Sequence, residues 1–525
     1  MLDTYGKPRP VVAAIQAQRR GTLGKQRRGR RRGVVMVVFA IVLIAILGMA
    51  GLVVDGAILT ATHRQAQNAA DAAALAAAMD RMRGRSTTDA TATATTFVQT
   101  HNGLTTAPAP TVNFPPSSGA YAGKNGYVEV IVNAPVQTYL IHVLGVAPNQ
   151  QVTARAVAGY EARAAGEGVM VLNPDARPGL DVSGGGTLRV EGRVVVNSEG
   201  GGVDENGEPI NNGNTGVAAS GGQPNSDTGI FAVNIDVVGG VDNPATFKPF
   251  DPADPSPLRT GQLPEPDPLI NLPTPTTATG VDSTQRGEIS VTNNNVLGIE
   301  NDQGGLNFVA VGGESVAGGL HTAAAGEAIL HPGIYDAFSI TGGAVYLVPG
   351  IYVIAPKKNV ATALKITGGT VTAERVMFYN TASSYNPSNG SPDANDFEDK
   401  TPLPNTDYAG GFTINAGMKF TPINTRAVNY ASLYTNARAV DPIFDGMLFY
   451  QRRRHQASID IQGDSAEGLL AGTLYAKWSN FKISGQGTYD AQFIAGSMSI
   501  TGQGNVTILG GGEGRGKANQ VFLVE

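Results

Sequence analysis

The sequence predicts a mainly β protein that is anchored by one N-terminal transmembrane helix. The 525-residue chain contains 68 Gly and 31 Pro but only 15% charged residues, a composition typical of frequent turns rather than long exposed helices. From residue 166 onward, short apolar runs alternate with Gly, Asn and Ser, and one uninterrupted apolar run lies at residues 34–54. We therefore expect a transmembrane helix, a small α+β module and a right-handed parallel β-helix (a β-solenoid), with a β-sandwich as the alternative to the β-helix.

Residues 34–54 are predicted to span the membrane. They contain no Asp, Glu, Lys or Arg, and a helix needs about 20 apolar residues to cross the hydrocarbon core. A cleaved signal peptide is the competing interpretation, but its apolar region is shorter, roughly 7–15 residues. A retained anchor is therefore favoured.

The charge on either side of this run predicts the orientation. Residues 1–33 carry ten Lys or Arg and one acid, Asp3, for a net charge of +9, and subtracting this from the whole-chain −5 leaves −14 for residues 34–525. Lys and Arg close to a span stay on the cytoplasmic side. We expect a single-pass inner-membrane protein with a basic cytoplasmic tail (1–33) and its bulk in the periplasm or outside the cell. The basic tail is read as a topology signal, and no nucleic-acid partner is expected.

Residues 55–165 are predicted to form an Ala-rich helix followed by a small α+β module. The segment 55–85 consists mostly of good helix formers and should continue the membrane helix. Its small Ala side chains would allow either close approach of a partner helix or packing on its own domain, and the sequence leaves both open. A polar helix is expected at Ser86 to Thr100, and strands at Tyr127 to Val132 and Val152 to Gly159.

The pattern across residues 30–80 resembles the N-terminal segment of the TadE/TadG-like proteins of Tad (Flp) pilus assembly. The resemblance rests on the Arg32-Gly33 entry, the Gly-Leu-Val-Val-Asp exit from Gly51 to Asp55, and the QNAADAAALA helix from Gln67. It is closer to the TadG branch than to processed minor pilins, because prepilin processing would require Glu where this chain has Val38. The resemblance implies a structural role in pilus assembly, with the inner membrane and other Tad proteins as partners.

Residues 166–525 are predicted to form the β-solenoid because a short unit recurs at near-coil spacing. A strand followed by a Gly-bearing turn, repeated in this way, is what stacked coils require. Gly at the turn can adopt backbone conformations that other residues avoid. The copies begin at Asp181, Ser339, Lys365, Lys482 and Ser499, with a degenerate copy at Asp460.

Three stretches need separate predictions. The Pro-rich segment 242–280 interrupts the solenoid and should be extended, either as a flexible linker or as a strap along the solenoid. Residues Asn380 to Asp407 form a polar excursion. The final QVFLVE, from Gln520, is expected to close the last coil.

The sequence offers no catalytic, cofactor-binding or metal-binding residues to which we assign a role. There is no Cys, the six His show no helical pairing, and the loop from Gly511 to Lys517 is followed by Ala518 where a nucleotide-binding loop needs Ser or Thr.

Acidic groups are the remaining candidates for chemistry. A carboxylate pair of a polysaccharide-cleaving enzyme could come from Asp441, Asp445, Asp460, Asp464 and Asp490 beside Arg452, Arg453 and Arg454, and loose calcium ligands could come from Asp393, Asp396, Glu398 and Asp399. Solvated turns and ion pairs are the preferred interpretation of both sets. The aromatic residues Phe444, Phe449, Tyr450, Tyr475 and Trp478 are expected in the core. We expect a non-enzymatic scaffold without cofactors; the alternative is an anchored carbohydrate-binding adhesin or polysaccharide-degrading β-helix enzyme, with surface polysaccharide as the partner.

Overall fold

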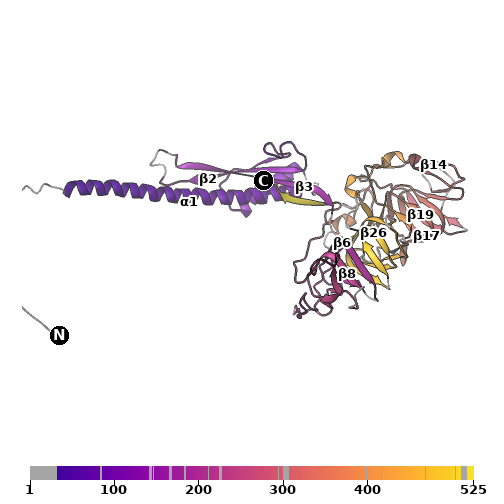
Figure 1. The fold of residues 1–525 in the computed structure, drawn as a ribbon. Helices are drawn as coiled ribbons and strands as arrows, with labels where there is room; N and C mark the ends of the chain where they lie inside the picture. Colours follow the sequence, from indigo (N-terminus) through magenta and orange to yellow (C-terminus); the bar gives the residue numbers. More distant parts are fainter. Residues whose placement is uncertain are drawn as a thin grey trace, which may run out of the picture. The chain divides into compact units, whose positions relative to one another are not determined.

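A computed structural model (Figure 1) describes the chain in two compact units. Unit 1 comprises residues 1–74, 92–112 and 129–156, and unit 2 comprises residues 75–91, 113–128 and 157–525. The structure describes residues 32–82, 86–140, 145, 147–164, 168–182, 185–210, 212–223, 228–293, 295–298, 307–396, 400–415, 417–466, 469–502, 504–509 and 517–524. The predicted basic tail lies outside these residues up to residue 31.

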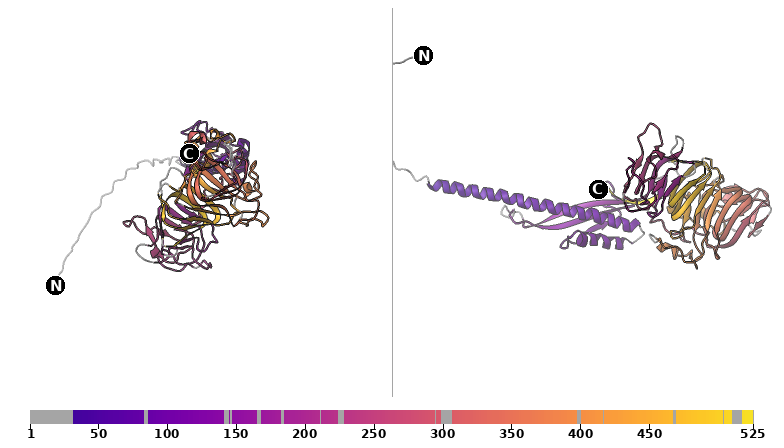
Figure 2. Two further views of the ribbon diagram at one scale, coloured as in Figure 1. Left: turned by 90° about the vertical axis from the view of Figure 1, so that its right-hand side faces the viewer. Right: turned by 90° about the horizontal axis from the view of Figure 1, so that it is seen from below.

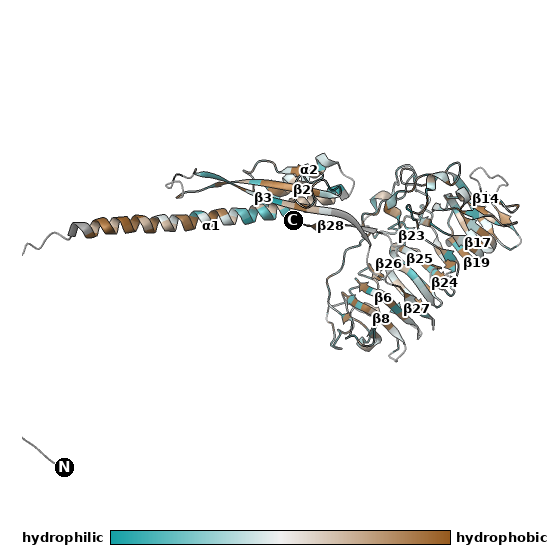
Figure 3. Ribbon diagram, turned by 45° about the horizontal axis from the view of Figure 1, so that its top comes forward, coloured by the Kyte–Doolittle hydropathy of each residue, from teal (hydrophilic) through white to brown (hydrophobic). Residues whose placement is uncertain are grey.

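Helix α1 is continuous from Arg32 to Met82, so the apolar run and the Ala-rich segment form one helix, as predicted. Gly56 does not interrupt it. Figure 3 shows the change along α1 from apolar to mixed hydropathy. Because helix formers fill both halves, the backbone hydrogen bonds carry through the polar boundary at Asp55.

The remaining elements near the N-terminus follow the predicted order. Helix α2 (Thr87–Thr96) continues into a π-helical turn (Phe97–His101), which matches the predicted polar helix. Strands β2 (Tyr127–Gln137) and β3 (Asn149–Ala164) contain the two predicted strands, and β1 (Thr111–Asn113) is an addition. The strand order in this sheet is β1-β2-β3-β28.

The C-terminal strand corrects one prediction. Strand β28 (Lys517–Leu523) does not close a solenoid coil but pairs antiparallel with β3, from Lys517 opposite Ala164 to Leu523 opposite Ala158. Sequence alternation predicts a strand correctly, but it cannot say which edge the strand joins. The larger sheet is thus inserted between two strands that are hydrogen-bonded neighbours.

The larger sheet has 22 strands and runs from β4 to β27, leaving out the separate hairpin β14–β15. Its first strands are β4 (Val169–Val171), β5 (Leu180–Val182), β6 (Thr187–Val196), β7 (Ala219–Ser220), β8 (Gly229–Val237), β9 (Phe247–Pro249), β10 (Leu258–Arg259), β11 (Gln285–Val291), β12 (Val296–Leu297), β13 (Phe308–Val309) and β16 (Ala328–Leu330). They are followed by β17 (Gly333–Leu347), β18 (Gly350–Ile354), β19 (Thr362–Ala373), β20 (Val376–Asn380), β21 (Gly411–Asn415), β22 (Lys419–Phe420), β23 (Met447–Gln451), β24 (Ile459–Gln462), β25 (Ala471–Ser484), β26 (Gly487–Thr501) and β27 (Asn505–Ile508). The hairpin consists of β14 (Ser315–Val316) and β15 (His321–Thr322), and short 3-10 turns lie at Pro244–Thr246, Ala317–Gly319, Asp393–Asn395, Tyr430–Ser432 and Pro442–Phe444.

The predicted repeats stack in register through parallel pairing. Ser339 lies opposite Lys365, Asp460 opposite Lys482, and Lys482 opposite Ser499, which in turn lies opposite Asp181. The residue after each of these is Ile or Val, and these side chains are buried in a column. Long parallel ladders are the arrangement that stacked coils predict, whereas a sandwich of antiparallel sheets is not seen in the described part of the chain.

The order of strands in the stack differs from their order in the chain. Strand β26 pairs with β25 on one side and with β4 and β5 on the other, and β27 pairs with β6. Figure 2 shows the yellow C-terminal strands between the magenta strands of the first coils and the orange strands of the middle of the chain. The first and last strands of the larger sheet are therefore neighbours in its interior.

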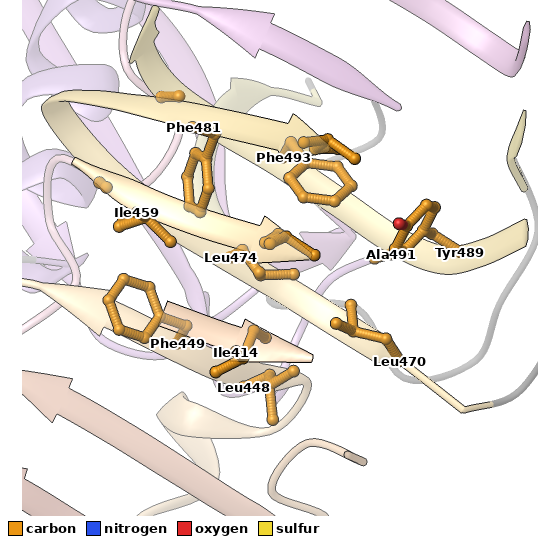
Figure 4. Packing of buried hydrophobic residues seen from close by; sticks show 14 of the residues in the cluster. Ile414, Leu448, Phe449, Ile459, Leu470, Leu474, Phe481, Tyr489, Ala491 and Phe493 are labelled. Atoms are coloured by element: carbon orange, nitrogen blue, oxygen red, sulfur yellow. The ribbon is translucent and has the colours of Figure 1, made fainter. Parts of the chain in front are cut away.

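The strands of the larger sheet contribute apolar side chains to a shared core. Figure 4 shows Phe449, Phe481 and Phe493, which come from successive strands and point into the same interior. Their rings lie 6.4 Å and 5.6 Å apart from one to the next, at steep angles. Edge-to-face contacts of this kind add to the stabilisation from burial.

The Pro-rich segment 242–280 is partly stranded and partly a strap. Its first part forms the short strands β9 and β10, which pair with β8 and which the composition did not predict. Residues 265–284, called the strap here, then cross the stack. Asn197 in the loop after β6 exchanges hydrogen bonds with the backbone of Glu265 at 2.7 Å and 3.0 Å, and Tyr385, beyond β20, donates to the carbonyl of Pro275 at 2.6 Å. Residues 265–284 are therefore hydrogen-bonded to the larger sheet and its loops.

Arg453 holds the middle of the strap. Its guanidinium donates to the carbonyl oxygens of Leu269, Ile270 and Leu272, each at 2.9 Å, and to the hydroxyl of Tyr475 at 3.1 Å. The side chain is buried, and Arg suits this position because its planar donors can serve several acceptors at once.

Asp267 provides the compensating charge on the strap. Its carboxylate accepts a hydrogen bond from Tyr475 at 2.7 Å and lies 3.2 Å from the ammonium nitrogen of Lys477. Burial raises the pKa of Tyr475 well above its usual value, so this phenol stays protonated as a donor. Buried charges that are paired in this way tolerate desolvation.

Replacing Arg453 with Ala should destabilise the parallel sheet by about 3–5 kcal/mol, because it removes a buried cation and leaves three carbonyl oxygens of the strap without their donor. Urea unfolding of the full chain, followed by the fluorescence of its single tryptophan, Trp478, measures the effect. Arg438→Ala removes an exposed arginine and is the matched control. Equal midpoints for the two variants would contradict the role of Arg453.

Candidate functional site at the end of the apolar helix

The apolar half of α1 presents its side chains outward along its length. Ile44, Leu47 and Val53 are 70%, 60% and 71% exposed, and an 18-residue window of the helix has a mean hydropathy of 3.1 with only 6% of it buried. By length and composition this helix can cross a membrane. Exposed aliphatic side chains on this scale are unfavourable in water.

Asp55, at the polar end of this run, is fully buried. One carboxylate oxygen accepts a hydrogen bond from the backbone N–H of Tyr139 at 3.0 Å, and the other accepts one from the N–H of Leu140 at 2.7 Å. Hydrogen bonds to an ionised acceptor are stronger than neutral ones. Asp55 therefore fastens the connection between β2 and β3 to the helix.

Gly51 lies one helical turn before Asp55 and allows the close contact. A Cβ atom at this position would lie 2.7 Å from the Cβ of Leu140 and 2.9 Å from its Cδ1. Any larger residue would therefore push Leu140 off the helix. We call Gly51, Asp55, Tyr139 and Leu140 the collar.

Further along the helix, Gln67 ties α1 to the sheet. Its side-chain amide donates to the carbonyl of Arg155 in β3 at 3.0 Å and to the carboxylate of Asp71 at 2.8 Å. Arg155 in turn forms an ion pair of 2.6 Å with the fully buried Glu129 in β2. Asp71 thus orients the amide that joins helix to strand.

The Ala side of the helix is buried. Ala66, Ala69, Ala70, Ala73 and Ala74 have no exposed surface. Of the two interpretations that the sequence left open, packing within the protein is the one observed. The small Ala side chains on one side of the helix allow the elements that cover them to approach closely.

These residues lie in a segment that matches a known protein family. Residues 33–80 match the Tad family, described as putative Flp pilus-assembly TadE/G-like. The resemblance inferred from the sequence is confirmed. No curated protein and no solved structure matches the chain.

The Tad segment, residues 33–80, contains Gly51, Asp55, Gln67 and Asp71, so its motif residues have structural roles here. Gly51 and Asp55 contact the β2–β3 connection, and Gln67 and Asp71 join the helix to β3. Tyr139 and Leu140, which complete the collar, lie outside the matched segment. They lie in a largely apolar stretch from Val136 to Leu144, to which the sequence analysis assigned no role. The available signal was the uncharged stretch between Glu129 and Arg155.

Asp441, Asp445 and Asp464, from the predicted carboxylate set, accept backbone hydrogen bonds. Asp441 accepts from Ile443 and holds a local turn, whereas Asp445 accepts from Thr425 and Asp464 from Gln486, which lie 20 and 22 residues away in sequence. Asp460 and Asp490 lie on β24 and β26. The turn interpretation is confirmed for Asp441.

Arg452 contacts a different set of carboxylates. Its guanidinium contacts Asp393 at 3.1 Å, Asp396 at 2.6 Å and Asp407 at 2.8 Å. The cluster joins the polar excursion after β20 to β23, with Tyr379 also donating to Asp393. Because the arginine occupies the centre of these carboxylates, the cluster is a buried ion network.

The other predicted sites are placed as follows. Glu398 and Asp399, and the Gly-rich loop up to residue 516, lie outside the described residues. Within the part of the chain that the structure describes, no group of three or more His, Asp or Glu is arranged to hold a metal ion. Phe444, Phe449, Tyr450 and Tyr475 are buried in the core as predicted, and Trp478 is half-buried.

Gly51→Ala should release the collar, whereas Gly48→Ala should not, because a Cβ at Gly48 meets no atom within 4 Å. Loss of hydrogen bonds to a charged acceptor costs about 1.5–3 kcal/mol, which corresponds to roughly 10- to 100-fold faster amide exchange. Hydrogen exchange of the peptide containing Tyr139 and Leu140, in the detergent-solubilised full chain, measures this. Equal exchange in both variants would contradict the collar.

Two buried groups near Arg452 should give opposite pH dependences. Burial raises the pKa of Asp393 from 3.8 to about 6, and burial lowers the pKa of His455 from 6.5 to about 4. At pH values between 3.8 and about 6, Asp393 binds more protons in the folded chain than in the unfolded chain. Its contribution to the free energy of unfolding therefore falls as the pH rises through about 6. Folded His455 binds fewer, so its contribution is lost as pH drops from 6.5 towards 4.

When the pH falls from about 7.5 to about 5, protonation linked to His455 should lower the free energy of unfolding by roughly 2 kcal/mol, and His455→Asn should remove this loss. Over the same range Asp393 should raise the free energy of unfolding by roughly 1 kcal/mol, and Asp393→Asn should remove this gain. Thermal unfolding of both variants and of the unaltered chain at the two pH values checks this. If all three proteins show the same pH slope, the assignment is wrong.

Proposed function

We propose that this protein is a non-enzymatic, single-pass inner-membrane scaffold of Tad pilus assembly, similar to TadG. The basic tail stays in the cytoplasm, the apolar half of α1 spans the membrane, and the rest lies on the far side. The inserted sheet is proposed to wind as a right-handed parallel β-helix.

The match of residues 33–80 to the Tad family, on a helix whose apolar half is exposed, carries this proposal. The match covers the candidate span and the helix beyond it. Exposed apolar surface of this length is explained by lipid or by partner helices. The charge difference across the run supports the orientation.

A scaffolding mechanism fits the placement of the helix faces. The Ala side beyond Asp55 is buried within the protein, so it is not available to a partner helix. We propose that pilus-assembly partners contact α1 within its apolar half. The parallel sheet then forms a large body outside the membrane, and the chain enters and leaves it on the neighbouring strands β3 and β28.

Deleting residues 34–54 should move the protein from salt-washed membranes to the soluble fraction. A tag before residue 1 should resist protease in sealed, right-side-out vesicles, and a tag after residue 525 should be cleaved. Retention of the shortened chain in the membrane fraction would contradict the anchor.

Partner contacts can be tested with photo-crosslinkers in native membranes. A crosslinker at Ile44, which is 70% exposed on the apolar helix, should capture Tad proteins. The matched control is Val233 in β8, which is 55% exposed. Identical products from both positions, or none from Ile44, would contradict partner binding through the span.

A further inference from the structure

Tyr139 and Leu140 are exposed apolar side chains at the end of the smaller sheet. They are 58% and 47% exposed, although the backbone N–H of each is fixed by the buried Asp55. A rigidly held backbone that presents an aromatic and a branched aliphatic side chain to the outside is the geometry of a contact surface.

The position of these side chains along α1 identifies what they contact. Leu140 packs on Gly51, which precedes Asp55 by four residues and lies inside the apolar run. With a rise of about 1.5 Å per residue, Gly51 is about 6 Å inside the polar end of the run. If the run lies in lipid, Leu140 lies at the depth of its outermost turn.

The composition of the chain around Tyr139 and Leu140 suits a position at the membrane surface. Between Glu129 and Arg155 the sequence contains no Asp, Glu, Lys or Arg. Tyr is enriched where membranes meet water, because its ring is apolar and its hydroxyl can remain hydrated. The carboxylate of Asp55 is satisfied by two backbone donors, so it can lie close to the interface.

We propose that Tyr139 and Leu140 insert into the extracytoplasmic leaflet beside α1, giving the protein a second membrane contact. This rests on the proposed anchoring of α1. The partner is the lipid surface itself, and the collar positions the two side chains by holding their backbone at the level of Gly51. The second contact restricts rotation of α1 about its own axis relative to the membrane plane.

The chain has no Cys, so single-Cys variants of the full protein can carry an environment-sensitive fluorophore. We would label Leu140→Cys, Ile44→Cys and Gln151→Cys and reconstitute each in phosphatidylcholine–phosphatidylglycerol vesicles with or without spin-labelled lipid. Ile44 reports the span, and Gln151, exposed on β3, is the solvent control. Labelling at residue 140 leaves its backbone bond to Asp55 in place.

Spin-labelled lipid should remove most of the emission at residues 44 and 140 and little at residue 151. Quenching at residue 44 together with iodide-accessible emission at residue 140 would overturn the inference and leave the anchor intact. No lipid quenching at residue 44 would overturn both. Emission at residue 140 that is shielded from lipid and iodide alike would indicate contact with a second protein copy and would overturn the lipid assignment.

A second variant tests how the collar positions the contact. Asp55→Asn keeps the shape of the side chain but replaces one acceptor oxygen with a donor, so one of the two N–H bonds is lost. Lipid quenching at residue 140 should then fall several-fold, while quenching at residue 44 stays unchanged. Gly48→Ala is the control and should leave both unchanged. Full quenching at residue 140 in Asp55→Asn would overturn the positioning role of the collar.

Discussion

The parallel pairing of the first strands with the last determines the rest of the larger sheet. Strand β26 joins β25 to β4 and β5, so the strands that begin and end the sheet in the sequence are neighbours. The middle of the chain must then lie towards one end of the sheet, and a connection must cross the strands to reach it. The strap makes that crossing, and the buried Arg453 and Asp267 stabilise it because an extended Pro-rich segment has few hydrogen bonds of its own.

The pairing of β28 with β3 places the chain's entry to the larger sheet beside its exit from that sheet. Residue 164 ends β3 opposite residue 517, where β28 begins. An insertion whose ends are adjacent can be large without disturbing the sheet that holds it. In the smaller sheet, Gln67 joins α1 to β3, and the ion pair of Arg155 with Glu129 joins β3 to β2.

Polar groups in this protein mostly organise structure. Arg452 with its three carboxylates, Arg453 with its three carbonyls and Asp55 with two N–H groups each satisfy several buried partners at once. Such clusters fix the position of irregular segments that have no β-sheet hydrogen bonds of their own. Asp393 and Asp396, which the sequence analysis considered as calcium ligands, serve this purpose.

The sequence by itself determined the local features: the continuous helix with its apolar half, the β-rich character, the in-register repeats and the aromatic core. These depend on composition and on the spacing of apolar residues, which act over a few neighbours. Tertiary structure alone decided that β28 pairs with β3, that β26 meets β4, and that Tyr139 and Leu140 seat on Gly51 and Asp55. These contacts join residues far apart in sequence, and a strand's pattern specifies which face is buried but not which distant edge completes its hydrogen bonds.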